Sequence, residues 1–394
     1  MQLLTPTEEK MWEKTPSLNH ITMSDQQIND KYEKGEQRIL TEMNREKLPA
    51  FVNALKKPGY MDLRPFYQRR NRWDKKKQSQ LIESFLINIP VPSIILYEKK
   101  YNVYEVMDGQ QRINALKEFY ENRLTLTGLT LWPELNGRTY NTLPGNIKAG
   151  IDRRSISYVV LITESASSPE DALFLKQLAF ERLNTGGEKL SRQEIRNCSF
   201  YSPFNQLLLE LARNQIFADA WNIPIDDDEE EELQKNNLYK KMEDAELVLR
   251  FFALRNTDKF RNGMQKFLNL YMMKSVSLPN DEIEFLRNSF IQAINLAHQI
   301  YEDKLFKPFD SQSDTWENKA FKDYYDAVMV GFSRHLADSD ANILLERKPR
   351  VIEKTKILFR EDKSKLFTGG GKTKADIQER IRLFDDMLSQ VIAE

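Results

Sequence analysis

One short segment, DGQQR from Asp108 to Arg112, combines residue types that suit the binding of an anion. Apolar residues at helical spacing follow it, and a β-rich run, Val103 to Met107, precedes it, so the segment lies where a strand gives way to a helix. A helix start offers unpaired N–H groups and the positive end of the helix dipole. Gly109 lets the backbone approach a ligand closely, and Arg112 can offer its fork of donors. Asp108 can hold a divalent cation or accept a proton from water. We therefore predict a phosphate site here.

A structural alternative exists for part of this segment. Asp108 and Gln111 have the spacing of a capping box, in which the cap and the residue three positions later bind each other's amides. A capping box explains neither the poor helix former Gly109 nor the cationic Arg112 on an otherwise apolar helix. Taken together, the five residues favour a ligand site.

A basic segment precedes this site in the sequence. The stretch from Arg64 to Lys77, RPFYQRRNRWDKKK, holds seven basic residues against one acid, with aromatic residues interleaved. This composition predicts contact with nucleic acid, the alternative being a solvated basic face. Trp73 has the alternative of a core residue instead of a base-stacking platform. The expected nucleic-acid-binding residues are Arg70, Arg72, Lys75, Lys76 and Lys77.

Flanking patterns predict the elements around both segments. A helix through Leu81 to Leu86, capped by Asp74, ends before Pro90, and Ser93 to Tyr97 with Val103 to Met107 reads as a hairpin. Further along, a strand is expected at Tyr158 to Ile162. A helix is expected to begin at Ser168-Pro169 and to end at Asn184, before Gly186-Gly187. Another helix is expected to begin at Ser191, where Glu194 completes a capping box.

The chain of 394 residues is long enough for two or three domains. We expect a polar N-terminal arm at 1–47, loosely attached, an α/β domain at 48–200, a connecting segment at 201–243 and an all-α domain at 244–394. The connecting segment contains the acidic run Asp226 to Glu232, which is expected to be a solvated loop. The predicted fold class is α+β.

Composition excludes several other classes of protein. With one cysteine, Cys198, and three scattered histidines, the chain has neither an internal disulfide nor a typical zinc site. No run has the roughly 18 apolar residues of a membrane span, and the first thirty residues lack the apolar centre of a signal peptide, so a cytoplasmic protein without membrane contact is expected. The net charge of −1 means that nucleic-acid binding must rest on a local patch.

Four elements of the sequence resemble the bacterial family named domain of unknown function 262, whose hallmark is DGQQR. Besides that hallmark, the similar elements are Gln68-Arg69 with Trp73, the stretch LIESFLINIPVP from Leu81 to Pro92, and FERLNTGG from Phe180 to Gly187 with the continuation Leu190 to Glu194. The resemblance covers roughly residues 48 to 200.

This resemblance implies a ParB/sulfiredoxin-like N-terminal domain that binds nucleotide phosphates. Related proteins act in anti-phage defence, including restriction enzymes of the GmrSD type, where DGQQR is tied to hydrolysis of nucleoside triphosphates or to DNA nicking. By resemblance the catalytic residues are Asp108, Gln111 and Arg112, with Mg or Mn at Asp108. The implied nucleotide-binding residues are Gly109, Gln110, Arg112, Gln68, Arg69, Arg182 and Asn184.

Two interpretations of function remain open at this stage. In one, the chain is a metal-dependent enzyme that hydrolyses nucleotide or nicks DNA; in the other, it is a non-catalytic nucleotide or DNA sensor that works with a protein effector or as a homo-oligomer through its helical half. The motif GGGKT at Gly369 to Thr373 lacks the earlier glycine of a P-loop, and isolated His298 and His335 do not make an HNH nuclease.

Overall fold

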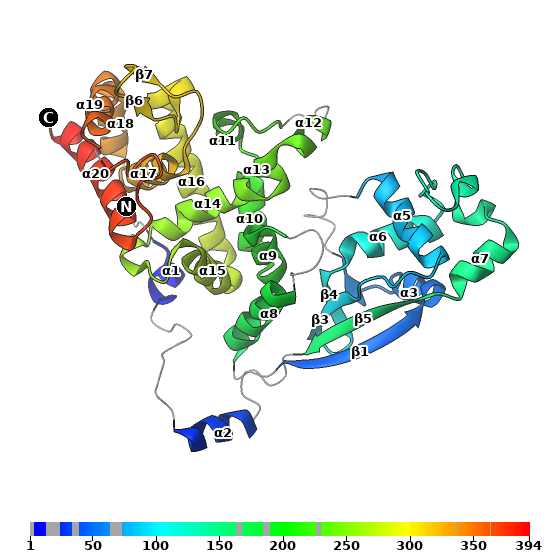
Figure 1. Ribbon diagram of the computed structural model, residues 1–394. Coiled ribbons are helices and arrows are strands. Elements are labelled where there is room, and N and C mark those ends of the chain that lie inside the picture. The colour runs from blue at the N-terminus through cyan, green and yellow to red at the C-terminus, as the bar shows by residue number, and fades with distance from the viewer. Residues whose placement is uncertain are drawn as a thin grey trace. The chain divides into compact units, whose positions relative to one another are not determined.

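The structure, a computed structural model, describes residues 4–12, 24–33, 39–63, 73–162, 168–183, 190–225, 230–336, 338–362 and 364–394. The chain divides into two compact units, whose elements are labelled in Figure 1. The sheet unit comprises Leu18–Lys189, and the helical unit comprises Met1–Ser17 together with Leu190–Glu394. The sheet unit is therefore inserted between two parts of the helical unit along the sequence.

A five-stranded mixed sheet is the centre of the sheet unit. Its strands are β1 (Leu40–Lys47), β2 (Met61–Asp62), β3 (Ile94–Lys100), β4 (Val103–Asp108) and β5 (Ser155–Ile162). The spatial order is β1-β5-β3-β4-β2, with β1 antiparallel to β5, β5 parallel to β3, β3 antiparallel to β4 and β4 parallel to β2. The predicted hairpin is the β3–β4 pair, in which Leu96 lies opposite Val106.

Helices pack on one face of this sheet. They are α3 (Leu48–Ala54), α5 (Lys75–Leu86), α6 (Gln110–Tyr120) and α7 (Gly145–Asp152), and they share one apolar core with the sheet. Two helices of the unit lie outside this layer: α2 (Asp25–Glu33) and α8 (Pro169–Leu183). Val106 belongs to the core, so its neighbour Glu105 points to the opposite face, where its carboxylate forms a buried ion pair with Lys176 of α8.

The helix starts predicted from capping residues are confirmed. Asp74 caps α5 by accepting from the Lys77 amide at 2.7 Å, and Ser168 accepts from the Asp171 amide at 3.1 Å at the start of α8. These caps satisfy amides that have no partner within the helix.

The helical unit contains α1 (Pro6–Lys10), α9 (Arg192–Ser199), α10 (Pro203–Leu211), α11 (Gln215–Ala220), α12 (Glu230–Lys235), α13 (Asn237–Lys240), α14 (Glu243–Leu254), α15 (Met264–Lys274), α16 (Asn280–Tyr301), α17 (Lys322–Arg334), α18 (Asp338–Glu346), α19 (Lys348–Glu361) and α20 (Lys374–Ala393). Helices α14, α16, α17 and α20 pack around buried aromatic rings. The unit also holds a two-stranded hairpin, β6 (Phe309–Asp310) with β7 (Thr315–Trp316), in which Trp316 packs edge-on against Phe309. It is thus largely helical, in agreement with the predicted helical domain, and the short hairpin is an addition to it.

The compact units divide the chain differently from the predicted domains. Residues 4–12 are not a loose arm: Glu8 is fully buried, and its carboxylate accepts from Tyr271 at 2.7 Å and pairs with Arg255 at 3.3 Å. The rest of the predicted arm contributes β1 to the sheet. The predicted connecting segment is part of the helical core, where Phe204 and Phe217 are fully buried. Of the acidic run, only the last residues, at the start of α12, lie in the described part of the chain.

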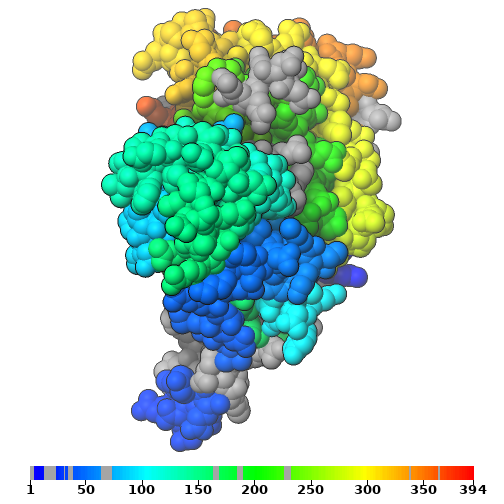
Figure 2. Space-filling model, turned by 90° about the vertical axis from the view of Figure 1, so that its right-hand side faces the viewer, coloured from blue at the N-terminus to red at the C-terminus, as the bar shows by residue number. Residues whose placement is uncertain are grey.

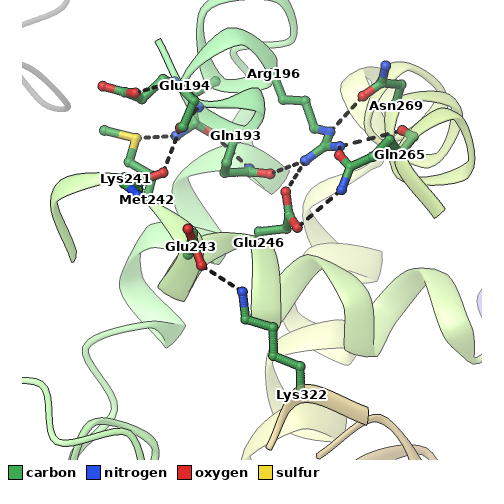
Figure 3. A network of polar contacts seen from close by, with 12 residues as sticks. Gln193, Glu194, Arg196, Lys241, Met242, Glu243, Glu246, Gln265, Asn269 and Lys322 are labelled. Atoms are coloured by element: carbon green, nitrogen blue, oxygen red, sulfur yellow. Dashed lines mark hydrogen bonds and ion pairs between the residues drawn. The ribbon is translucent and has the colours of Figure 1, made fainter. Parts of the chain in front are cut away.

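A polar network holds α9 to the helical unit (Figure 3). The buried guanidinium of Arg196 donates to Glu246 of α14 at 2.7 Å, to Asn269 of α15 at 2.7 Å and to Gln193 at 2.9 Å. Burial alone would raise the pKa of Glu246, but the charge and hydrogen bond of Arg196 oppose it and leave that pKa below its ordinary value. The predicted capping box at Ser191 and Glu194 is confirmed, so this end of the FERLNTGG element has a structural role.

Within the described ranges, no helix combines the length and the apolar character needed to cross a membrane.

Candidate anion site at the start of helix α6

Gly109 makes the turn between β4 and α6. Its φ of +95° lies in the left-handed region, which favours glycine. A Cβ at this position would lie 2.8 Å from Ile94 Cγ1 and 3.1 Å from Arg112 Nη2. Glycine is therefore required here, first of all, because the Gly109 backbone lies close to Ile94 of β3 and to Arg112 of the motif.

The capping box that was the structural alternative for Asp108 and Gln111 is not formed. The strand β4 extends through Asp108, so Gly109 becomes the cap residue of α6, and no side chain caps this helix. The first turn of an eleven-residue helix thus starts without the side-chain acceptor that α5, α8 and α9 have. An exogenous anion is a suitable partner for such a helix start.

Arg112 is held beside this helix start. Its Nη2 donates to Asp108 Oδ2 at 2.7 Å and to the Ser93 carbonyl at 3.4 Å. The side chain of Arg112 is only 13 % exposed, whereas that of Asp108 is 49 % exposed. The buried Nε of Arg112 has no hydrogen-bond partner among the described residues. In this ion pair the guanidinium of Arg112 is therefore largely buried, whereas the carboxylate of Asp108 is open to solvent.

The two glutamines of the motif bind backbone on either side of residues 64–72. Gln110 Nε2 donates to the carbonyl of Leu63, and Gln111 Oε1 accepts from the amide of Trp73 at 3.1 Å. Leu63 and Trp73 are the described residues that flank positions 64–72. The chain therefore enters and leaves that stretch beside the start of α6. Residues Gln68, Arg69, Arg70 and Arg72 lie within it, outside the described residues.

The remaining predicted residues lie on other elements. Trp73 is partly buried against the core of the sheet unit, in agreement with its core alternative. Lys75, Lys76 and Lys77 are exposed on the first turn of α5. Arg182 is exposed in the last turn of α8, and Asn184 lies outside the described residues.

A divalent metal would find few protein ligands here. Among the described residues, no group of three or more histidine, cysteine, aspartate or glutamate side chains is placed to hold an ion. The open carboxylate of Asp108 fits the way Mg²⁺ is often bound, through one or two carboxylates with the remaining ligands from phosphate oxygens and water. Asp108 is thus a fitting single ligand for a metal that arrives with a nucleotide.

The glycine-rich stretch near the C-terminus is packed on its own chain. Arg380 donates to the carbonyls of Leu366 at 3.0 Å and Gly371 at 3.1 Å, and a Cβ at Gly370 would lie 2.0 Å from the Ser364 carbonyl oxygen. Thr373 caps α20 as predicted. The stretch is a tight connection before a helix and has no cradle for phosphates.

Comparison with known proteins identifies the part of the chain that carries this site. Residues 50–201 match the family model described as the N-terminal domain of the GmrSD restriction endonuclease. The matched range runs from α3 to α9 and includes the whole Asp108–Arg112 segment. No curated protein and no solved structure matches the chain. The ParB/sulfiredoxin-like topology therefore stays a prediction, whereas the α+β class is confirmed.

Proposed function

We propose that the chain, whose residues 50–201 match the N-terminal domain of the GmrSD restriction endonuclease, binds a nucleoside triphosphate at the start of α6 and uses it in a restriction-like, anti-phage defence. The observation that carries the proposal is the Asp108–Arg112 pair at an uncapped helix start. DNA is the proposed target, and the helical unit is the proposed contact for an effector protein or a second copy.

Nucleotide binding would separate the Asp108–Arg112 ion pair, so that Arg112 pairs with phosphate and Asp108 with a cation. Phosphate oxygens are better matched to the arginine fork than a single carboxylate oxygen, because they can accept two parallel hydrogen bonds. Arg112 would turn its guanidinium from Asp108 to the phosphates, which also brings acceptors toward its unpartnered Nε. The released carboxylate of Asp108 is already half exposed and can face a cation without leaving its strand.

Hydrolysis would require that the site positions the phosphates and the attacking water and neutralises the negative charge of the phosphates. The divalent ion, when bound, neutralises charge on the phosphate oxygens. Arg112 and the amides of the first turn of α6 hold the phosphates, and Asp108 orients a water molecule on its open side. The oxygen of this water bonds to the terminal phosphorus as its proton passes to the Asp108 carboxylate, the bond to the bridging oxygen breaks, and the products are the diphosphate and inorganic phosphate. DNA nicking is the corresponding attack on a phosphodiester.

The second candidate is nucleotide sensing without turnover. It is favoured by the small number of carboxylates, because Asp108 is the single acidic residue of the motif and belongs to no group of three or more possible metal ligands in the described ranges. In this case the same pair binds the phosphates, and a separate effector acts on DNA.

Calorimetry and phosphate release separate these candidates. The protein is titrated with ATP and GTP in the presence of Mg²⁺ or Mn²⁺, then incubated with each nucleotide and with supercoiled plasmid. We expect Arg112→Ala to abolish binding and Asp108→Asn to keep binding but lose turnover. Arg123→Ala is the matched control, because Arg123 is a half-exposed arginine at the other end of α6. Phosphate release that persists in both site variants contradicts the proposal that Asp108 and Arg112 catalyse hydrolysis. Nucleotide binding that is unchanged in Arg112→Ala contradicts the proposed nucleotide site itself.

A further inference from the structure

The connection between α6 and α7 is a rigid, well-packed loop. Four leucines insert into the core of the sheet unit: Leu124, Leu126, Leu129 and Leu135. The backbone closes on itself, since Leu126 donates to the Arg138 carbonyl at 2.9 Å and accepts from the Gly137 amide at 2.8 Å. This loop is therefore held in place by contacts within the sheet unit itself.

Two side chains of α5 fix the tip of the loop. The buried carboxylate of Glu83 accepts from three successive amides, those of Thr130 at 3.1 Å, Leu131 at 2.7 Å and Trp132 at 3.0 Å. One turn earlier on α5, the Ser79 hydroxyl accepts from the Thr127 amide at 3.0 Å. A carboxylate with three backbone donors is a strong anchor for the segment that it holds.

Leu131 and Trp132 are nevertheless exposed at this anchored tip. Leu131 is 63 % exposed and Trp132 is 38 % exposed. Figure 2 shows the residues of this part of the chain, in teal to green, on the surface of the molecule. Single exposed apolar side chains are ordinary, so exposure alone says nothing about a partner. Here, however, two adjacent large apolar side chains are held outward on a fixed backbone.

Lys76, in the first turn of α5, lies on the same face of this helix as Ser79 and Glu83, because the three are spaced three and four residues apart. Lys76 lies against the loop, because a Cβ on Gly128 would be 2.9 Å from its Cγ. Seven residues of helix separate Lys76 from Glu83, which corresponds to about 10 Å along the axis. Lys75 and Lys77 are exposed beside Lys76.

We propose that Leu131 and Trp132 contact the bases of bound DNA while Lys75, Lys76 and Lys77 hold its phosphates. A polyanion is the partner that matches three adjacent lysines, and base faces are the apolar part of the same molecule. An apolar tip that is anchored about 10 Å along α5 from Lys76 can stack on a base or enter a base step near the phosphates that the lysines hold. This inference rests on the DNA target of the proposed function and adds the residues that recognise it.

The test measures binding of the full-length protein to a fluorescein-labelled 30-mer, single-stranded and duplex, by anisotropy at several salt concentrations. We expect the double variant Leu131→Ser/Trp132→Ser to bind about five- to tenfold more weakly with an unchanged salt dependence. The triple variant Lys75→Gln/Lys76→Gln/Lys77→Gln should instead lower the slope of log K against log salt by up to about three. Tyr101→Ser is the matched control, since Tyr101 is an exposed aromatic residue at the β3–β4 turn.

Each outcome has a distinct meaning once thermal unfolding has shown that the variants fold. A double variant that binds as tightly as the wild type, while the lysine variant binds more weakly, overturns the base contact and leaves DNA as the target. Wild-type protein that binds nucleotide but no DNA overturns the inference and leaves the nucleotide site. Sedimentation that shows a dimer lost in the double variant assigns the exposed pair to a second copy of the chain, and this also overturns the inference.

Discussion

Gln110 and Gln111 are neighbours in sequence, but their side-chain amides form hydrogen bonds of opposite sense. Gln110 donates through Nε2 to the carbonyl of Leu63, and Gln111 accepts through Oε1 from the amide of Trp73. The two backbone partners determine these roles, because a carbonyl can only accept and an amide can only donate. The pair therefore ties the chain on both sides of residues 64–72 to the start of α6.

This asymmetry predicts different responses to the same substitution. Gln110→Glu replaces the donor with a carboxylate facing a carbonyl, so we expect a loss of about 1 to 3 kcal/mol in unfolding free energy and faster tryptic cleavage near Leu63. Gln111→Glu keeps the acceptor for the Trp73 amide and should have a smaller effect in both measurements. Urea unfolding and limited trypsin digestion give the two readouts. Equal effects of the two variants would contradict the assignment of donor and acceptor.

Substitution of Gly109 should destabilise the protein even without ligand. Gly109→Ala places a methyl group 2.8 Å from Ile94 and forces an L-residue to a φ of +95°. We expect a loss of at least about 1 to 3 kcal/mol in unfolding free energy, measured by urea denaturation in nucleotide-free buffer. Gly145→Ala is the control, since a Cβ there meets no neighbouring atom. If Gly109→Ala reduced nucleotide binding and left stability unchanged, the glycine would serve the ligand and not the fold.

The Glu83 anchor should give the sheet unit a pH dependence. Burial raises the pKa of Glu83, but the three backbone donors more than offset this, so its pKa lies below the ordinary value of 4.5. A carboxyl group whose pKa is lower in the folded state contributes stability that is complete above its ordinary pKa and is lost as the pH falls through its folded pKa.

We therefore expect the difference in stability between the wild type and Glu83→Gln to be constant above about pH 6 and to shrink below pH 4.5. Thermal unfolding across this range measures it. A difference that grows on acidification would mean that the carboxylate is not the bound form.

The N-terminal segment should stabilise the helical unit. Glu8→Ala removes the carboxylate that pairs with Arg255 and accepts from Tyr271, leaving a buried guanidinium without this partner. We expect a loss of about 3 to 5 kcal/mol, the usual result of breaking a buried ion pair from one side. Glu9→Ala is the control, because Glu9 is exposed on the same helix. Similar unfolding midpoints for the two variants would show that residues 4–12 do not stabilise this unit.

Local patterns predicted the elements around the candidate site well. Local sequence makes these elements visible, because caps such as Asp74 and Ser191 and the short β-rich runs of β3 and β4 are properties of a few neighbouring residues. Strand β1 was missed, because Leu40–Lys47 is exposed on almost every position and has no apolar alternation. The compact units divide the chain before α9, whereas the predicted α/β domain and the family match both include this helix, because a capped helix does not reveal which core it packs on.

The candidate site was only partly predictable. The helix start, Gly109 and the Asp108–Arg112 pair follow from one short segment. The partners of Gln110 and Gln111 do not, because Leu63 and Trp73 take part through their backbone and any residue type could do so. The Glu83 anchor of the exposed tip was missed for the same reason, since its three partners are backbone amides.

We propose that Arg112 holds nucleotide phosphates, and the measurement that decides this is calorimetry with ATP and Mg²⁺ on the wild type, Arg112→Ala, Arg112→Lys and the control Arg123→Ala. We expect binding by the wild type and the control and none by Arg112→Ala. Binding should weaken by about ten- to a hundredfold in Arg112→Lys, which keeps the charge but loses the fork. Wild-type affinity in a correctly folded Arg112→Ala protein would contradict this proposal.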